Sequence, residues 1–303
     1  MTKKYVLSMS GGGVKGLIGA LFLYELCKRT GKQPRDLFDY FIGTSTGGII
    51  CLLLNSPKMY TTEDVVNFYV GDDAKSIFKP RFLKFPWEAL KYPSNQIESV
   101  LKYKFGEDIL KDCSNPVTVT AYDTVSRDSL FINSFEDKCF NLKMWECARA
   151  TSAAPTFFEP FSLNVMSLCD GGLFANNPTF FGYIEAKKLF PNDELIVVSL
   201  GTGSSATAIP YKSIIKWNII DWAINLFSLV TDGQSDTTHF ALKKLLPQER
   251  YFPFDLKLTK NMDEMDRIDN AFLNNLITLT KEYLAKEWKD ELNRLVSEIG
   301  SDN

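Results

Sequence analysis

One serine lies in a sequence pattern that prepares a hydroxyl group for nucleophilic attack. Ser45 stands between Gly43 and Gly47 in the sequence GTSTGG. It follows the apolar run 38–42 and precedes the apolar run 49–54. The pattern G-x-S-x-G between a strand and a helix is the nucleophile elbow, a sharp turn that pushes the serine hydroxyl clear of the sheet. The start of the following helix favours developing negative charge. Taken alone, the pattern also fits an idle serine in a glycine-rich turn.

A second glycine-rich loop comes earlier in the chain. It has the sequence GGGVKG at residues 11–16, after the apolar stretch Tyr5–Met9 and before residues 17–28, which are apolar at helical spacing. In that context G-x-G-x-x-G is a dinucleotide-binding fingerprint. Asp36 and Asp39 have roughly the spacing expected of an acid that binds the ribose. However, both precede the next apolar run instead of ending it.

The same glycines could instead form an oxyanion hole. Gly11, Gly12 and Gly13 leave backbone N–H groups uncovered, and such groups can hydrogen-bond the oxygen of a tetrahedral intermediate. One such donor stabilises a transition state by about 3 kcal/mol. We favour the oxyanion hole over a dinucleotide site and over a turn that binds no ligand. The reason is that the serine elbow occupies the position of a ribose-binding acid.

A nucleophilic serine needs a partner that accepts its proton. The only histidine, His239, lies in a segment expected to be helical, so a Ser–His–Asp triad is not expected. Asp170 is the better candidate, because it ends a strand-like segment and precedes Gly171 and Gly172, where backbones can approach closely. Carboxylates at strand ends of open α/β sheets face the ligand crevice. The alternative is a turn aspartate that accepts local N–H groups.

Bulk composition argues against several classes of function. The 303 residues are 45% hydrophobic, enough for one large core. A net charge of −3 gives no global basic field for nucleic acid. Six cysteines form no C-x-x-C pair and no zinc-ligand spacing, so we expect a reduced cytoplasmic protein without a metal site. There is no secretory h-region and no run of 18 apolar residues, so no transmembrane helix is expected.

Alternating strand-like and helical segments predict an α/β fold, a mostly parallel central sheet between two helical layers. We expect a single domain over residues 1–303. Its motif-bearing core covers about residues 5–205, and a helical C-terminal extension over about 210–299 packs on it. The predicted strands are 5–9, 38–42, 117–122, 130–135, 162–169 and 194–200, and the predicted C-terminal helices are 214–230, 235–246 and 270–299.

Three motifs in this order resemble the patatin-like phospholipase family: the glycine loop, the serine elbow and the sequence DGG at residues 170–172. The likeness covers roughly residues 5–205. Two positions depart from the family pattern, which often has Asp where Ser10 stands and Arg where Lys15 stands. Lysine cannot offer the planar fork of arginine. Shorter stretches also agree, namely ATSAAPTFF at 150–158, NNP at 176–178 and SLGTG at 199–203.

The resemblance implies a three-layer fold and a lipid acyl hydrolase of the phospholipase A or lysophospholipase type, without metal or other cofactor. Carried over by motif, Ser45 would be the nucleophile, Asp170 the general base, and Gly11, Gly12 and Gly13 the oxyanion hole. The substrate would be a phospholipid or another acyl lipid. Hydrolysis of triacylglycerol or galactolipid, a silent lipid-binding module on this fold, self-association and an activating effector stay open. Motif support would come from Lys15, Gly16, Gly43, Gly47, Gly171 and Gly172.

Two segments are candidates for transient contact with a membrane surface. Residues 78–92 carry four basic residues and one acidic residue, interleaved with aromatic ones. That pattern suits the head-group region, and it equally suits a packed lid. Residues 214–227 have a narrow polar stripe, which favours a mostly buried helix over an interfacial one. The amphipathic segment 270–299 is expected to pack on the core rather than to mediate self-association.

Overall fold

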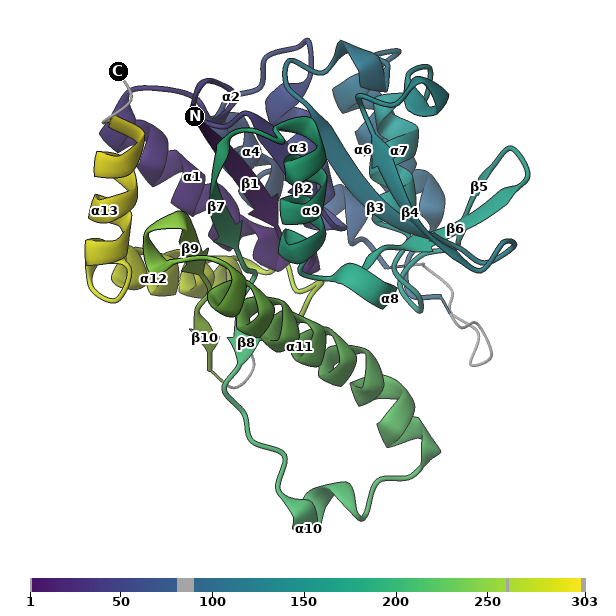
Figure 1. Cartoon of the computed structure of the whole chain (residues 1–303). Helices are drawn as coiled ribbons and strands as arrows, with labels where there is room; N and C mark the ends of the chain where they lie inside the picture. Colours follow the sequence, from purple (N-terminus) through teal and green to yellow (C-terminus); the bar gives the residue numbers. More distant parts are fainter. Residues whose placement is uncertain (1, 81–89, 260–261, 301–303) are drawn as a thin grey trace.

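A mixed β-sheet lies between two layers of helices in the computed structural model, which describes residues 2–80, 90–259 and 262–300 (Figure 1). The strands of the main sheet are β1 (Lys3–Met9), β2 (Tyr40–Gly43), β3 (Val117–Asp123), β4 (Asp128–Asn133), β5 (Phe161–Leu163), β6 (Met166–Asp170), β7 (Glu194–Leu200) and β9 (Tyr251–Phe254). Their order is β5-β6-β3-β2-β1-β7-β9, with β4 also paired to β3. A separate pair joins β8 (Ser204–Ser205) to β10 (Lys257–Leu258).

The centre of the main sheet is parallel. Strand β1 pairs in parallel with β2 and β7, β2 with β3, and β7 with β9. The pairs β3–β4, β3–β6 and β5–β6 are antiparallel and lie towards one edge. Parallel strands need covered faces and crossover helices. The predicted α/β fold with a mostly parallel central sheet is therefore confirmed.

Hydrophobic cores lie on both faces of the sheet. Along β1, Tyr5, Leu7 and Met9 enter the larger core, whereas Val6 enters the smaller one. This is the period of two that a strand imposes. The larger core is covered by α1 (Gly16–Thr30), α3 (Thr46–Asn55), α4 (Thr62–Val70), α5 (Asp72–Ile77), α6 (Ser94–Phe105), α7 (Met144–Thr151), α12 (Asn270–Ala285) and α13 (Lys289–Gly300), and the smaller core by α9 (Thr179–Leu189) and α11 (Ile219–Leu245).

Several predicted elements have different limits in the structure. The segment 162–169 is a hairpin of β5 and β6, because the chain turns back at Asn164, which has a φ of +54°. The predicted helices 214–230 and 235–246 form one helix, α11, preceded by the short α10 (Tyr211–Ile214). Gly233 lies inside it, because packing elsewhere along the helix outweighs a glycine penalty of about 1 kcal/mol. The segment 270–299 is broken at residues 286–288 into α12 and α13, which pack beside α1.

The prediction that residues 214–227 form a mostly buried helix is wrong. Ile219, Trp222 and Leu226 are exposed, and so is Val230 in the next turn. Figure 1 shows α10 and the first turns of α11 projecting away from the sheet. An apolar period alone does not say whether a helix face meets a core or solvent, which is why the sequence misled here.

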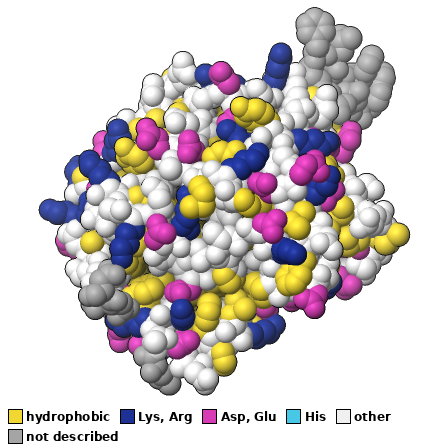
Figure 2. Space-filling view, turned by 90° about the horizontal axis from the view of Figure 1, so that it is seen from above, with side chains coloured by type: hydrophobic (Ala, Val, Ile, Leu, Met, Phe, Trp, Pro, Cys, Tyr) yellow, Lys and Arg dark blue, Asp and Glu magenta, His cyan; other side chains and the backbone are white. Residues whose placement is uncertain are grey.

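The basic and aromatic patch predicted over residues 78–92 falls largely on residues 81–89, which lie outside the described residues. Its two ends pack on the larger core. The rings of Phe78 and Tyr92 are 5.4 Å apart, and the Tyr92 hydroxyl donates to an Asp266 carboxylate oxygen at 2.6 Å. Charges of both signs are mixed over the face seen in Figure 2, so this face presents no broad field of one sign. Among the described residues, no helix combines the length and the hydropathy needed to cross a bilayer.

Helix α3 approaches β1 so closely that one glycine is indispensable. A Cβ atom at Gly47 would lie 2.2 Å from the Met9 carbonyl oxygen, which is backbone and cannot give way. We therefore expect Gly47→Ala to lower the free energy of unfolding by about 1–3 kcal/mol or more, as overpacking does. Gly233→Ala in α11, where a Cβ meets nothing within 4 Å, is the control and should raise it by about 0.5–1 kcal/mol. Urea unfolding compares the two, and equal stability of Gly47→Ala and wild type would contradict the expectation.

Candidate active site

Ser45 occupies the predicted strand–turn–helix. Strand β2 ends at Gly43 and α3 begins at Thr46, so Thr44 and Ser45 form the corner, with Ser45 directly before the helix. Its φ of +55° and ψ of −125° lie in a region that residues with a side chain rarely adopt. The Ser45 amide donates to Thr151 Oγ1 at 2.9 Å, which secures the turn from the neighbouring helix α7. This conformation is the strained geometry expected of a nucleophile elbow.

Asp170 meets Ser45 because of the sheet register. It is the last residue of β6 and pairs with Ala121 of β3, the strand that lies next to β2. The Ser45 side chain is close enough to the Asp170 carboxylate to lower the pKa of that group. The amide of Gly172 donates to Asp170 Oδ1 at 2.7 Å. Two residues far apart in the sequence are thereby placed as nucleophile and base candidates.

The environment of Asp170 raises the pKa of its carboxyl group to near neutral pH. The residue is only 2% exposed. Burial raises the pKa of Asp170 to about 7, although the Ser45 side chain and the hydrogen bond from the Gly172 amide lower it. No charged group among the described residues contributes to the shift. A carboxylate with a pKa near 7 is a stronger base than an exposed one, and it is ionised in half of the molecules at that pH.

The glycine loop lies against the elbow. A Cβ atom placed on Gly11 would be 3.2 Å from Ser45 Cβ. The Gly11 amide already donates to the Asn176 carbonyl at 2.9 Å. The amides of Gly12 and Gly13 donate to no acceptor within the described part of the chain. These two N–H groups are therefore the candidates for an oxyanion hole.

Glycine is required at the centre of this loop for two reasons. Gly13 has a φ of +60°, and a Cβ atom there would lie 2.0 Å from the Met265 carbonyl oxygen. The same carbonyl accepts the Val14 amide at 2.8 Å, so the segment around Met265 holds the loop in place. The position of the Gly12 and Gly13 amides thus depends on a contact with the C-terminal part of the chain.

The remaining motif residues support the site in different ways. A Cβ atom on Gly16 would lie 2.5 Å from both Thr46 Oγ1 and the Tyr69 hydroxyl, which are hydrogen-bonded to each other at the start of α3. A Cβ atom on Gly171 would lie even closer, 2.0 Å from Thr120 Oγ1 of β3. Lys15 is nearly buried and faces a separate cleft, whose lining includes neither Ser45 nor Asp170.

His239 lies elsewhere, as the sequence led us to expect. Its Nδ1 is 2.5 Å from the Tyr251 hydroxyl, and its Nε2 is 3.3 Å from Asn177 Nδ2. Burial lowers the pKa of His239 to about 4, so the ring is neutral at physiological pH. The histidine serves as a hydrogen-bonding group between α11 and β9.

The acids that a dinucleotide site would need are engaged at the other end of the sheet. Asp36 Oδ2 accepts the Gln33 amide at the start of α2 (Pro34–Leu37). Asp39 accepts the Lys4 ammonium at 2.7 Å and the Tyr5 amide at 2.8 Å, near the start of β1. The glycine loop follows the opposite end of that strand. The described residues also contain no group of three His, Cys, Asp or Glu side chains arranged to hold a metal ion.

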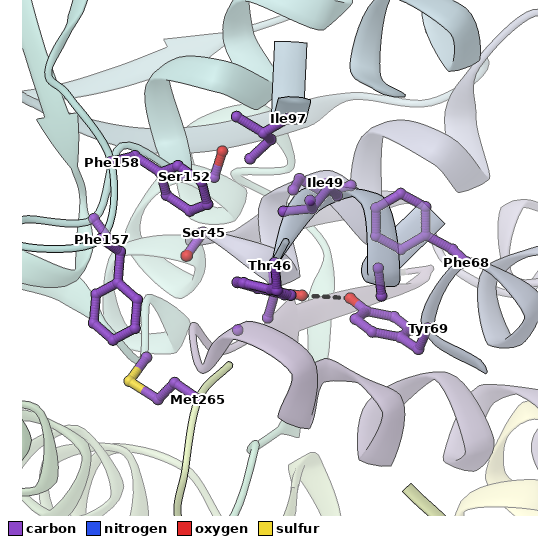
Figure 3. A pocket seen from close by; sticks show the side chains of 15 residues that line it. Ser45, Thr46, Ile49, Phe68, Tyr69, Ile97, Ser152, Phe157, Phe158 and Met265 are labelled. Carbon is purple, nitrogen blue, oxygen red and sulfur yellow. Dashed lines mark hydrogen bonds between the residues drawn. The ribbon is translucent and has the colours of Figure 1, made fainter. Parts of the chain in front are cut away.

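An apolar pocket opens at Ser45. It contains about 550 Å³ of empty space including its mouth, and helices α3 to α6 form much of its wall. Figure 3 shows the Ser45 hydroxyl with Phe157 and Phe158 on one side and Ile49 on the other. Sequence reasoning missed these residues, because apolar side chains at helical spacing look alike in a pocket and in a core. The lining includes Ile49, Phe68, Ala74, Ile77, Phe78, Ile97, Ala154, Phe157, Phe158 and Met265.

Comparison with known proteins decides the family. The sequence model of the family described as "Patatin-like phospholipase" matches residues 7–181, more than half of the chain. The chain belongs to the patatin-like phospholipase family. "Probable inactive patatin-like protein 9" of Arabidopsis thaliana is 30% identical over 269 residues, which cover 78% of this chain and 70% of that protein. The predicted family is therefore confirmed.

Other relatives share less of their length with this chain. "Calcium-independent phospholipase A2-gamma" of Homo sapiens is 29% identical over 297 residues, which cover 89% of this chain but only 37% of that protein. The chain thus spans less than two-fifths of that relative. The solved structure of VipD from Legionella pneumophila has a TM-score of 0.45 and 11% identity over 97% of this chain and 67% of its own, a similarity too remote to inform the chemistry here.

The raised pKa of Asp170 predicts how its replacement changes stability. Ionising this buried group costs free energy at high pH, whereas asparagine stays neutral throughout. The pKa is 3.8 for an ordinary aspartate and about 7 for Asp170 in the folded protein. By linkage, this rise in pKa lowers the free energy of unfolding of wild type by up to roughly 4 kcal/mol at pH 8.5, and by nothing below pH 4. Asp170→Asn should therefore gain stability over wild type at pH 8.5 relative to pH 5.

Thermal unfolding at both pH values measures this gain. The control is Asp236→Asn, an exposed aspartate on α11 that should change the melting temperature equally at both pH values. An Asp170→Asn protein whose advantage over wild type is the same at pH 5 and pH 8.5 would show that Asp170 is not a buried acid with a raised pKa.

Proposed function

We propose that this chain hydrolyses fatty acyl esters of phospholipids or lysophospholipids through Ser45 and Asp170. One observation carries the proposal: Ser45, which lines an apolar pocket, interacts with the buried Asp170 carboxylate and lowers its pKa. Family membership supports acyl lipids as the substrate class. The apolar pocket suits an acyl chain, because its lining offers few polar groups.

The proposed reaction is acyl transfer in two steps. Ser45 Oγ attacks the ester carbonyl carbon while Asp170 accepts the hydroxyl proton. The Gly12 and Gly13 amides hydrogen-bond the carbonyl oxygen as it becomes negative. The carbon–oxygen bond to the alcohol then breaks, and Asp170 gives its proton to the leaving alcohol. In the second step Asp170 takes a proton from water, the hydroxyl attacks the acyl-serine, and the fatty acid leaves as the proton returns to Ser45.

A catalytically silent lipid-binding module on the same fold is the main alternative, and one relative is indeed named probable inactive. The proximity of Ser45 and Asp170 argues against it here. A buried carboxylate and a serine with a positive φ both cost free energy, and an inert fold would gain nothing from keeping them side by side. A fluorophosphonate probe separates the two, since it reacts covalently with an activated serine. Triacylglycerol and galactolipid hydrolysis are separated from phospholipid hydrolysis by the products that each lipid yields.

Substitution of the two residues tests the proposal directly. Ser45→Ala and Asp170→Asn should each lower kcat for ester hydrolysis by at least about a thousandfold, because the residues of such a unit act together. His239→Gln, outside the site, should keep the wild-type rate. Release of fatty acid from lysophospholipid micelles measures all three, and Ser45→Ala should also lose labelling by the probe. An Asp170→Asn enzyme that retains near-normal hydrolysis would show that Asp170 is not the base that activates Ser45.

We also propose that the chain reaches its substrate by transient contact with a membrane surface through α11. Ile219, Trp222, Leu226 and Val230 are exposed and recur every three or four residues, so they form one apolar stripe along that helix. The same helix reaches the active site, where Phe227 lies 3.5 Å from the position of a Cβ atom on Gly172. A lipid surface is the occupant that would meet the stripe and the substrate pocket together.

The stripe can be tested without touching the dyad. Leu226→Glu should lower partitioning onto phospholipid vesicles about tenfold or more, because a buried leucine contributes about 1.5–3 kcal/mol. The matched control is Val165→Glu at the exposed turn between β5 and β6. Vesicle flotation compares the two. Unchanged flotation of Leu226→Glu, or a loss of self-association in its place, would overturn the membrane role and assign the stripe to a second copy of the chain.

A further inference from the structure

A polar cleft lies on the other side of the glycine loop from the apolar pocket. Gly13 lines the pocket, Gly11 and Gly12 line the cleft, and Met265 borders both. The cleft holds about 1130 Å³ of empty space including its opening. Helix α11, which crosses the end of the sheet in Figure 1, supplies one wall. A molecule that extends beyond the reacting ester therefore has a second compartment beside the first.

Lys15 is the unusual residue of this cleft. It is 8% exposed and lines the empty space. Its ammonium group makes no hydrogen bond or ion pair with residues 2–80, 90–259 or 262–300. The carboxylates of Asp263, Asp232 and Asp255 act on it only through longer-range Coulomb attraction. Burial lowers the pKa of Lys15, and these carboxylates oppose that shift. Because an unpaired buried cation is costly, an anionic acceptor in the cleft would be bound favourably.

Two carboxylates face the same space. Asp232 is half-buried on α11, and Asp263 is exposed on the segment before Met265. One cation and two carboxylates complement a ligand that carries a negative and a positive group close together. The described lining contains no aromatic side chain, whereas quaternary ammonium ions are recognised by aromatic cages. A primary ammonium group, with three hydrogen-bond donors, fits the carboxylates better.

We propose that the cleft binds the phosphoethanolamine head group of a phospholipid, with Lys15 at the phosphate and Asp232 and Asp263 at the ammonium group. The assignment rests on the hydrolysis by Ser45 proposed above. With the acyl chain in the apolar pocket and the head group in the cleft, the ester between them lies at the glycine loop. The site thereby selects among phospholipids by head group.

The carboxylates are tested by comparing two lipids with the same acyl chains. In neutral detergent micelles at fixed salt, wild type should hydrolyse phosphatidylethanolamine with a kcat/KM about tenfold above that for phosphatidylglycerol, since a charged hydrogen bond is worth about that factor. The double variant Asp232→Asn/Asp263→Asn should bring the ratio close to one. Asp236→Asn, one turn further along α11 and outside the cleft lining, should keep the wild-type ratio.

Lys15 is tested by a different ratio, because its substitution could also disturb the loop. Phosphatidylethanolamine is compared with diacylglycerol of the same acyl chains, so that any general loss of activity cancels. Lys15→Met should lower the preference for the phospholipid about tenfold, since it removes a charged hydrogen bond. Lys15→Arg should keep it, because the cation remains.

The results separate this inference from the proposed function. If wild type cleaves both phospholipids equally well, or if the double variant keeps the preference, the head-group site is wrong and acyl hydrolysis stands. If wild type cleaves no acyl lipid, the proposed function is wrong. The cleft is then judged by calorimetric titration of Ser45→Ala protein with glycerophosphoethanolamine. Binding that Asp232→Asn/Asp263→Asn abolishes would support the site, and absence of binding would overturn it.

Discussion

A carboxyl group without contact to water must either find hydrogen-bond donors or stay protonated, and the active site is built around this constraint on Asp170. The groups that can donate to it are the Gly172 amide and the Ser45 hydroxyl, both neutral. Their positions follow from the register of β6 on β3 and from the corner between β2 and α3. Because no cation takes part, the carboxyl group is left poised between its two protonation states near neutral pH. A displacement of either donor would remove that balance.

The sequence was sufficient for the parts of the site that carry their own backbone signature. Glycines around Ser45 and at residues 11–13 mark turns that few other residues allow. Two further glycines, Gly171 and Gly172, follow Asp170. The apolar pocket has no such signature, since Phe68 or Ile97 would look the same in a solid core. Thr151, which holds the Ser45 amide, was visible only as part of a family stretch.

The errors in the fold have the same origin. Strand β9 was missed because Tyr251–Phe254 is a four-residue strand that contains a proline and is defined only by its pairing with β7. The exposed face of α11 was assigned to the interior because apolar spacing does not identify what covers it. Contacts between distant segments decide both cases, and a single sequence does not record them.

The glycine loop holds backbone amides in position, and it also separates the apolar pocket from the polar cleft. Gly13 faces apolar side chains, whereas Gly11 and Gly12 face a space lined by hydroxyls and charges. An amphiphilic molecule bound across the loop would have its apolar part in the apolar pocket and its polar part in the polar cleft. Met265, which touches both compartments and holds the loop through its carbonyl oxygen, couples the position of the loop to the C-terminal segment.

The pairing of β1 with β7 has a consequence for folding during synthesis of the chain. All seven residues of β1 pair with β7, whose first residue, Glu194, follows Met9 by 194 − 9 = 185 positions. At a synthesis rate of about 5–20 residues per second, β1 leaves the ribosome roughly 10–40 s before its partner exists. Residues 7–181, the part matched by the family, contain neither β7 nor β9. The stretch that the family model matches is therefore shorter than the stretch that must be synthesised before the sheet can close.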